Sequence, residues 1–212
     1  MGSSFNAAEK VVVVDVGSPP VSFSVPEAIL CSTSEFLKAK IKPEWSQEGA
    51  SIQIPDSPAD AFSLYVNWLY DRSSAINAGV NMVMLASAYV LGEGIMDTAF
   101  KDTIIDIMKG RIFSDKHRAV LAIDGVDIVK TIYEGTPRGS AARKLLAHVF
   151  AFRASVGDLS AAFDSAPKEF YYNVALVARK PVDVGMSYAF LDTIEKCSYH
   201  CHQGKEYCYF GL

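Results

Sequence analysis

The sequence lacks the features of several large classes of protein. No N-terminal basic stretch precedes an apolar run, so secretion is not predicted. The longest uncharged window, residues 73–92, contains serines and asparagines that a bilayer span would penalise. Lysines and arginines are scattered singly, and the formal net charge is -4, which argues against a groove for nucleic acid. We therefore expect neither a membrane nor nucleic acid as a partner.

Motifs for common enzyme chemistry are missing as well. The sequence contains no Gly-x-x-x-x-Gly-Lys and no Gly-x-Gly-x-x-Gly, so an ATPase or a dehydrogenase is not predicted. Cys31 with His117 or His148 would need a glycine elbow, an orienting acid and an oxyanion loop, and none is near them in the sequence. His148 is expected on the exposed face of a helix. We predict that the protein is not an enzyme.

Cysteine is scarce, with four residues in the chain. Cys31 is expected to be a small buried hydrophobic residue, and the other three are clustered near the end of the sequence. This distribution is not that of a secreted disulfide framework. The expected compartment is therefore the cytoplasm, the nucleus or both.

The cluster near the end, residues 197–212, combines cysteine with histidine. Cys197, His200, His202 and Cys208 supply the soft and imidazole ligands that zinc prefers, with Cys201 as an alternate. Their spacing differs from that of a standard zinc finger, which separates two ligand pairs by a dozen residues or more. Two interpretations stay open: a zinc site, or a cysteine-rich tail packed on the last helix.

Hydrophobic residues make up 50% of the chain, enough for a packed core. The valine-rich residues 11–16 and the alternating residues 21–25 predict a hairpin joined by a Gly-Ser-Pro-Pro turn. The continuous apolar run of the first strand is typical of a strand covered on both faces. Ile52 and Ile54 alternate and predict a third short strand.

Helices are predicted from capping signals and apolar spacing. Ser32 with Glu35 has the spacing of a capping box, and Ser57 followed by proline predicts the start of another helix. Residues 83–91 form a helix expected to end at Gly92. Met96, Phe100, Ile104 and Met108 mark a further helix, which is expected to stop at Gly110, and apolar stripes predict only helices after Ile112. Four large residues should be buried together under the strands: Phe36, Phe62, Leu69 and Leu91.

The segment from Val21 to Leu37 resembles the BTB/POZ domain, which joins an early strand to a helical hairpin through an ordered string of residues. The matching positions are Phe23, Val25, Ile29, Leu30, Ser34 and Phe36, while Pro26 replaces the usual histidine. Further matches are the Trp-Leu-Tyr at residues 68–70 and the Leu-Gly at residues 91–92. The Ile-Tyr-Glu-x-Thr-Pro string at residues 132–137 is similar to a group of fungal BTB-domain proteins with a helical extension and a Cys/His tail.

The resemblance implies an α+β fold in which a short sheet is flanked by helical hairpins and followed by an all-helical region. The expected divisions are an N-terminal arm at residues 1–10, a BTB/POZ-like domain at 11–110, a helical extension at 111–196 and the tail at 197–212. No kelch repeat, zinc-finger array or MATH domain accompanies them.

The resemblance also implies a non-catalytic interaction module. Its expected partners are a cullin scaffold of a ubiquitin ligase, for which the chain would be an adaptor, or another BTB-domain chain. Because the arm before Val11 is short, a homodimer through an exchanged arm is the less expected of the two. The implied partner-binding residues are Phe36, Ile41, Trp45, Gln47 and Glu48, with the acid one position later than in the family. Trp45 as a cap over the core is an open alternative, and a zinc-dependent structural or regulatory protein is the alternative function.

Overall fold

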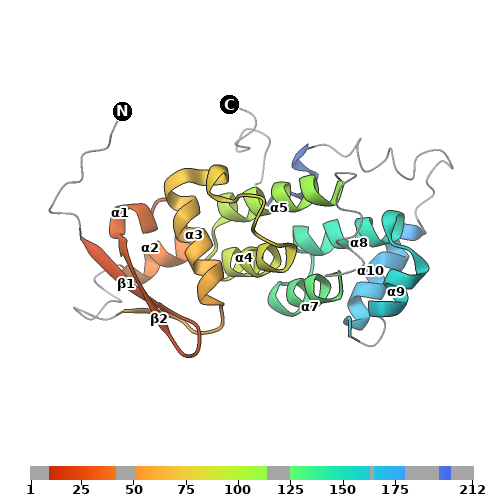
Figure 1. The fold of residues 1–212 in the computed structure, drawn as a ribbon, viewed down its shortest axis with the longest axis horizontal. Helices are drawn as coiled ribbons and strands as arrows, with labels where there is room; N and C mark the ends of the chain where they lie inside the picture. The colour runs from red at the N-terminus through yellow and green to blue at the C-terminus, as the bar shows by residue number, and fades with distance from the viewer. Residues whose placement is uncertain (1–9, 42–50, 114–124, 163–164, 180–195, 202–212) are drawn as a thin grey trace.

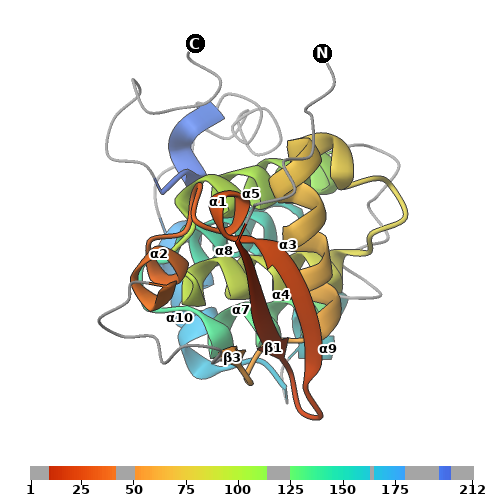
Figure 2. The same ribbon diagram turned by 90° about the vertical axis from the view of Figure 1, so that its left-hand side faces the viewer.

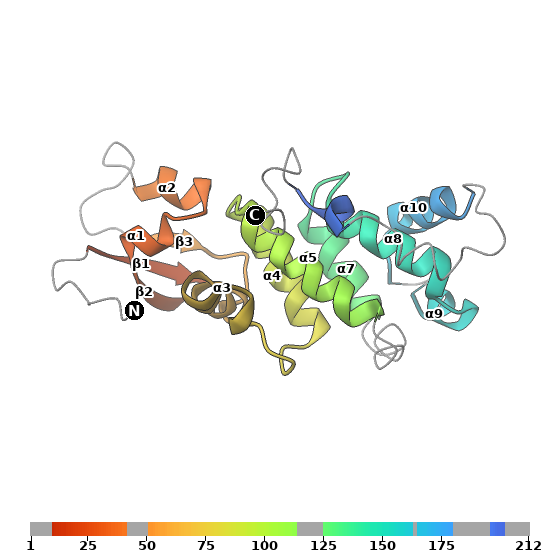
Figure 3. The ribbon, with the colours of Figure 1, turned by 90° about the horizontal axis from the view of Figure 1, so that it is seen from above.

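The computed structural model describes residues 10–41, 51–113, 125–162, 165–179 and 196–201. A small sheet lies at one end of an elongated molecule, and the helices continue away from it in a row (Figures 1 and 3). Within the described residues, no helix is long and apolar enough to cross a membrane. The mixed α+β class predicted from the sequence is confirmed.

The sheet has the strand order β2-β1-β3. Strands β1 (Val11–Val16) and β2 (Val21–Pro26) pair antiparallel, and β3 (Ile52–Ile54) pairs parallel with β1. The turn between β1 and β2 needs Gly17, whose φ of 86° is unfavourable for other residues. The predicted hairpin and third strand are therefore confirmed.

The prediction that β1 is covered on both faces is wrong. Val14 and Val16 are fully buried, whereas Val11 and Val13 are 55% and 41% exposed. Figure 2 looks onto the sheet and shows the helices behind it. A run of valines therefore forms a strand with one solvated face, as is common in antiparallel pairing.

The helices follow one another along the chain. They are α1 (Glu27–Leu30), α2 (Glu35–Ile41), α3 (Ala59–Asp71), η1 (Arg72–Ala75), α4 (Met82–Gly94), α5 (Thr98–Phe113), α7 (Gly125–Gly135), α8 (Ala141–Arg153), α9 (Val156–Ala162), α10 (Lys168–Ala178) and the 3-10 turn η3 (Lys196–Tyr199). Helix α9 and the two 3-10 turns were not predicted from the apolar spacing.

Several predicted helix ends are wrong. Ser34 rather than Ser32 caps α2, because its Oγ accepts from the Leu37 amide at 3.0 Å while the Ser32 hydroxyl donates back to Ile29. Pro58 stands at the N-cap of α3, one residue after the predicted Ser57.

The glycines predicted to end two helices lie inside them. Gly92 is part of α4, where a Cβ would come within 2.8 Å of the Lys101 side chain, so the glycine allows α5 to pack closely. Gly110 lies within α5, which continues to Phe113. Met96 is outside α5 and 53% exposed, although Phe100, Ile104 and Met108 are fully buried as the spacing predicts.

One contiguous core extends from the sheet into the C-terminal helices. Phe62, Leu69 and Leu91 are buried in it as predicted. The prediction that Phe36 is buried with them is wrong, because its ring packs against the edge of this core and is only half-buried. Helices α4 and α7 approach closely at Gly135, where a Cβ would lie 2.4 Å from a Val90 methyl group. The helices after α5 therefore share their packing with the part of the chain that contains the sheet and helices α1 to α5.

Candidate functional site

The first candidate site is the surface of α2, which carries two of the five residues implied as partner contacts. Phe36 is half-buried, and the Lys40 ammonium lies 5.5 Å from the centroid of its ring. Ile41 is only 8% exposed and lies in the core, so it supports the helix rather than offering a surface. Trp45, Gln47 and Glu48 lie outside the described residues. The described part of this site is an aromatic face with a cation beside it.

A buried polar network fixes the N-terminal end of α2. The Ser34 hydroxyl, fully buried, donates to the Ile95 carbonyl at 2.6 Å. The buried carboxylate of Asp97 accepts from the Tyr65 hydroxyl at 2.9 Å and the Phe100 amide at 3.0 Å, and also from the Thr33 hydroxyl. Because these groups come from four parts of the chain, α2 is held in a defined position against α3 and α5.

The second candidate site is made by residues 196–201, which we call the strap. Its central residue Tyr199 is fully buried against α8. The hydroxyl of Tyr199 lies 2.7 Å from His148 Nδ1. The ammonium groups of Lys144 and Lys109 lie 5.5 and 5.8 Å from the centroid of the ring. Burial raises the pKa of the Tyr199 phenol, so it stays neutral at physiological pH.

Polar contacts hold the residues on either side of Tyr199. His200 Nε2 lies 2.9 Å from Asp106 Oδ2, and the imidazole is fully buried. The Cys201 amide donates to Asp102 Oδ1 at 2.7 Å. On the other side, Lys144 Nζ donates to the Ser198 carbonyl at 2.9 Å. The strap is thus bound by side chains of both α5 and α8.

Cys201 packs at the end of the strap against Tyr89 of α4, with 3.7 Å between its Sγ and the tyrosine hydroxyl. Burial is the main cause that raises the pKa of both the Cys201 thiol and the Tyr89 phenol. Burial likewise raises the pKa of the Cys31 thiol, which is half-buried rather than buried as predicted. These thiols are held neutral and are poor nucleophiles.

Only some of the zinc ligands predicted from the sequence are among the residues that the structure describes. Cys197 and His200 lie on the strap with the alternate Cys201, and His202 and Cys208 lie outside the described residues. Among residues with a described placement, no group of three or more His, Cys, Asp or Glu side chains is arranged to hold a metal ion. The zinc site therefore stays a prediction, and His200 has a carboxylate partner in Asp106.

His148 differs from its expected place on an exposed helix face. It is half-buried, because Tyr199 covers it with ring centroids 5.7 Å apart. Sequence reasoning also missed Asp102, Asp106 and Lys109. Their spacing of four and three residues places them on one face of a helix. This spacing could have predicted a polar surface for contacts with another segment.

Comparisons with known proteins identify no relative. No family model, no curated protein and no solved structure matches the chain.

Proposed function

We propose that the protein is a non-catalytic interaction module of the BTB/POZ type, with a helical extension and a Cys/His tail similar to the fungal group. The order of elements supports this proposal: a hairpin, the α1–α2 helical hairpin, β3, and then α3, α4 and α5. It is the order expected for a short sheet flanked by helical hairpins. The proposed place of action is the cytoplasm, the nucleus or both.

The proposed partner surface is centred on α2 and the segment that follows it. The observation that carries this proposal is Phe36, an aromatic ring only half-buried on a helix that the Ser34 and Asp97 contacts hold in place. An aromatic side chain on a rigid element is a favourable anchor, because little entropy is lost when a partner covers it. Trp45 follows at a short sequence distance and is proposed as the second anchor.

A cullin scaffold of a ubiquitin ligase is the proposed partner, with the chain as its adaptor, and a second BTB-type chain is the alternative. In the family, this helix and the loop after it face the cullin. The acid at Glu48, displaced by one position, is proposed to serve in place of the usual one, together with Gln47. No N-terminal arm is required for this contact, whereas exchange between two copies would use one.

The experiment is a calorimetric titration of the purified chain with the N-terminal domain of a cullin. Phe36→Ala should weaken binding by about tenfold or more. Tyr172→Ala, which truncates a 62% exposed tyrosine on the distant α10, is the matched control and should change nothing. Light scattering of the same samples measures self-association. Absence of cullin binding, together with a dimer unaffected by Phe36→Ala, would contradict the proposed surface.

A further inference from the structure

The strap packs on helices that are far from it in the sequence. His200 contacts Asp106, 94 residues away, and the Cys201 amide contacts Asp102, 99 residues away. Figures 1 and 3 show η3 lying beside α5 and α8, away from the sheet and α2. The proposed partner surface on α2 makes no use of this arrangement.

The surface under the strap is shaped for a tyrosine. The ring of Tyr199 is excluded from solvent and has the ammonium groups of Lys109 and Lys144 within cation–π range. Its hydroxyl reaches His148, which distinguishes a tyrosine from a phenylalanine. The contacts of Tyr199 therefore combine two cation–π interactions with its ring and one polar group at its hydroxyl.

The neighbouring contacts are those of peptide recognition. Lys144 binds a backbone carbonyl and Asp102 binds a backbone amide of the strap. Because every peptide has these backbone groups, the two contacts do not depend on the sequence of the peptide. Asp106 binds the imidazole that follows the tyrosine and adds sequence preference. A buried anchor residue flanked by backbone hydrogen bonds is the general means by which short peptides are bound.

We propose that α5 and α8 form a binding groove for a peptide containing tyrosine followed by histidine, and that the strap occupies this groove in cis. A single 3-10 turn is not stable in isolation, so the strap owes its conformation to the groove. Its covalent attachment makes its binding intramolecular, which favours the strap over a free peptide of the same sequence. A partner peptide of the same chemistry binds when it displaces the strap, which makes the strap an autoinhibitory contact.

The test uses a fluorescein-labelled peptide with the sequence of residues 196–201, kept reduced, and the full chain as wild type or Tyr199→Ala. Fluorescence anisotropy should show the peptide binding the Tyr199→Ala variant about tenfold or more tighter than the wild type, because the competing residue is gone. A peptide with alanine in place of its tyrosine should not bind. Adding His148→Ala to Tyr199→Ala should weaken peptide binding again.

Tyr172→Ala is the matched control, since it removes an exposed tyrosine from α10 and should leave peptide binding as in the wild type. Circular dichroism checks that each variant is folded, and His200→Ala, which keeps the tyrosine anchor, is the second way to weaken the strap. Equal peptide binding by the wild type and the folded variants would overturn the proposal. So would unfolding of both variants, because the strap would then be part of the fold rather than a displaceable ligand.

Discussion

The half of the molecule that contains the sheet packs aromatic rings around the buried carboxylate of Asp97, whereas the helical half places the buried guanidinium of Arg143 between two helices. In the first half, the rings of Phe62, Tyr65 and Trp68 all come from α3. The Tyr65 hydroxyl donates to the carboxylate of Asp97. In the second, Arg143 is 6% exposed and binds α7 and α10 together. Hydrophobic packing tolerates some change in shape, but a buried charge depends on every one of its partners. Truncation of a side chain to alanine should therefore lower the free energy of unfolding for a different reason in each half.

The largest loss is expected in the aromatic core. Phe62 is fully buried, with its ring 5.0 Å from that of Phe23. Phe62→Ala should lower the free energy of unfolding by about 3 to 5 kcal/mol, measured by urea denaturation, because it leaves a cavity. A loss under about 1 kcal/mol would contradict the described packing.

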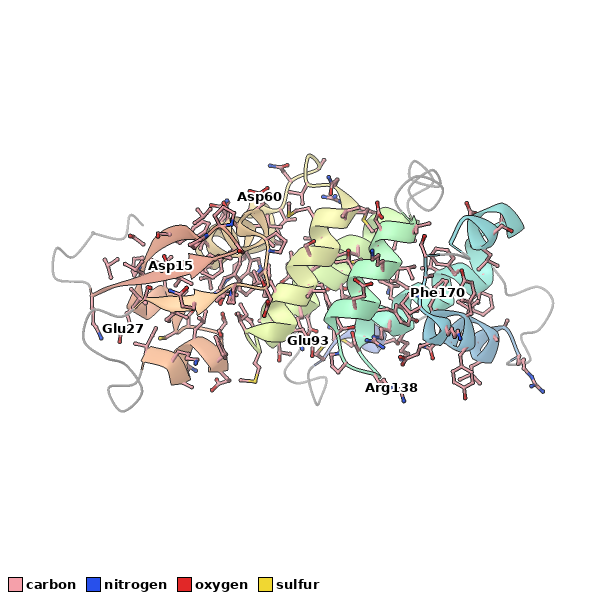
Figure 4. The ribbon with its side chains drawn as sticks, turned by 90° about the horizontal axis from the view of Figure 1, so that it is seen from below. Asp15, Glu27, Asp60, Glu93, Arg138 and Phe170 are labelled. Carbon is pink, nitrogen blue, oxygen red and sulfur yellow. The ribbon has the colours of Figure 1, made fainter. Side chains whose placement is uncertain are left out.

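Asp97→Ala should lower the free energy of unfolding by somewhat less, about 2 to 4 kcal/mol, because the Tyr65 hydroxyl and the Phe100 amide lose their acceptor. Asp60→Ala is the control, since Asp60 is an exposed residue in the first turn of α3 (Figure 4). It should cost under about 1 kcal/mol. Equal losses for the two variants would show that the Asp97 network does not hold the sheet end together.

Arg143 and Arg138 provide a matched pair in the helical half, because both contact Glu169. Arg143 lies 3.1 Å from it with 7% of its side chain exposed. Arg138, which is labelled in Figure 4, lies 3.5 Å from it with 88% of its side chain exposed. Arg143→Ala should cost about 2 to 3 kcal/mol, since it also frees the carbonyls of Tyr133 and Thr136. Arg138→Ala should cost under about 0.5 kcal/mol. Similar losses in thermal and urea unfolding would mean that burial does not set the strength of this contact.

Removal of zinc should have the smallest effect on stability. The zinc prediction for Cys197, His200, His202 and Cys208 expects about one equivalent in protein purified without chelator. The strap has protein contacts through Tyr199, His200 and Cys201, so a chelator should lower the melting temperature less than Tyr199→Ala does. Less than about a tenth of an equivalent, measured by elemental analysis, would reject the site. A larger fall than that of Tyr199→Ala would show that metal, not the groove, holds the strap.

The sheet and helices α3 to α5 could be predicted from the sequence, because alternation and apolar spacing are local signals. The choice between Ser32 and Ser34 as a cap could not, since it depends on the Ile95 carbonyl, 61 residues from Ser34. The same limit applies to His148, whose exposure was predicted from the stripe of α8 alone. Tyr199, 51 residues later, covers it.

One of the two candidate sites could be predicted from the sequence and the other could not. Phe36 could be chosen as a candidate from the sequence because it lies in a local pattern of residues, 21–37, and the structure leaves its ring half-buried. The groove under the strap could not be found, because Asp106 and Lys109 on α5 become neighbours of Tyr199 only through the fold. Sequence patterns predict which faces are polar but do not predict which distant residue covers them.

We propose that the protein binds another protein through α2 and the segment after it, and Trp45→Ala tests this proposal. The affinity of the variant for the cullin domain is measured together with its melting temperature. We predict that binding weakens by about 2 kcal/mol, roughly thirtyfold, and that the melting temperature does not change. A lower melting temperature with unchanged affinity would contradict it and make Trp45 a cap over the core.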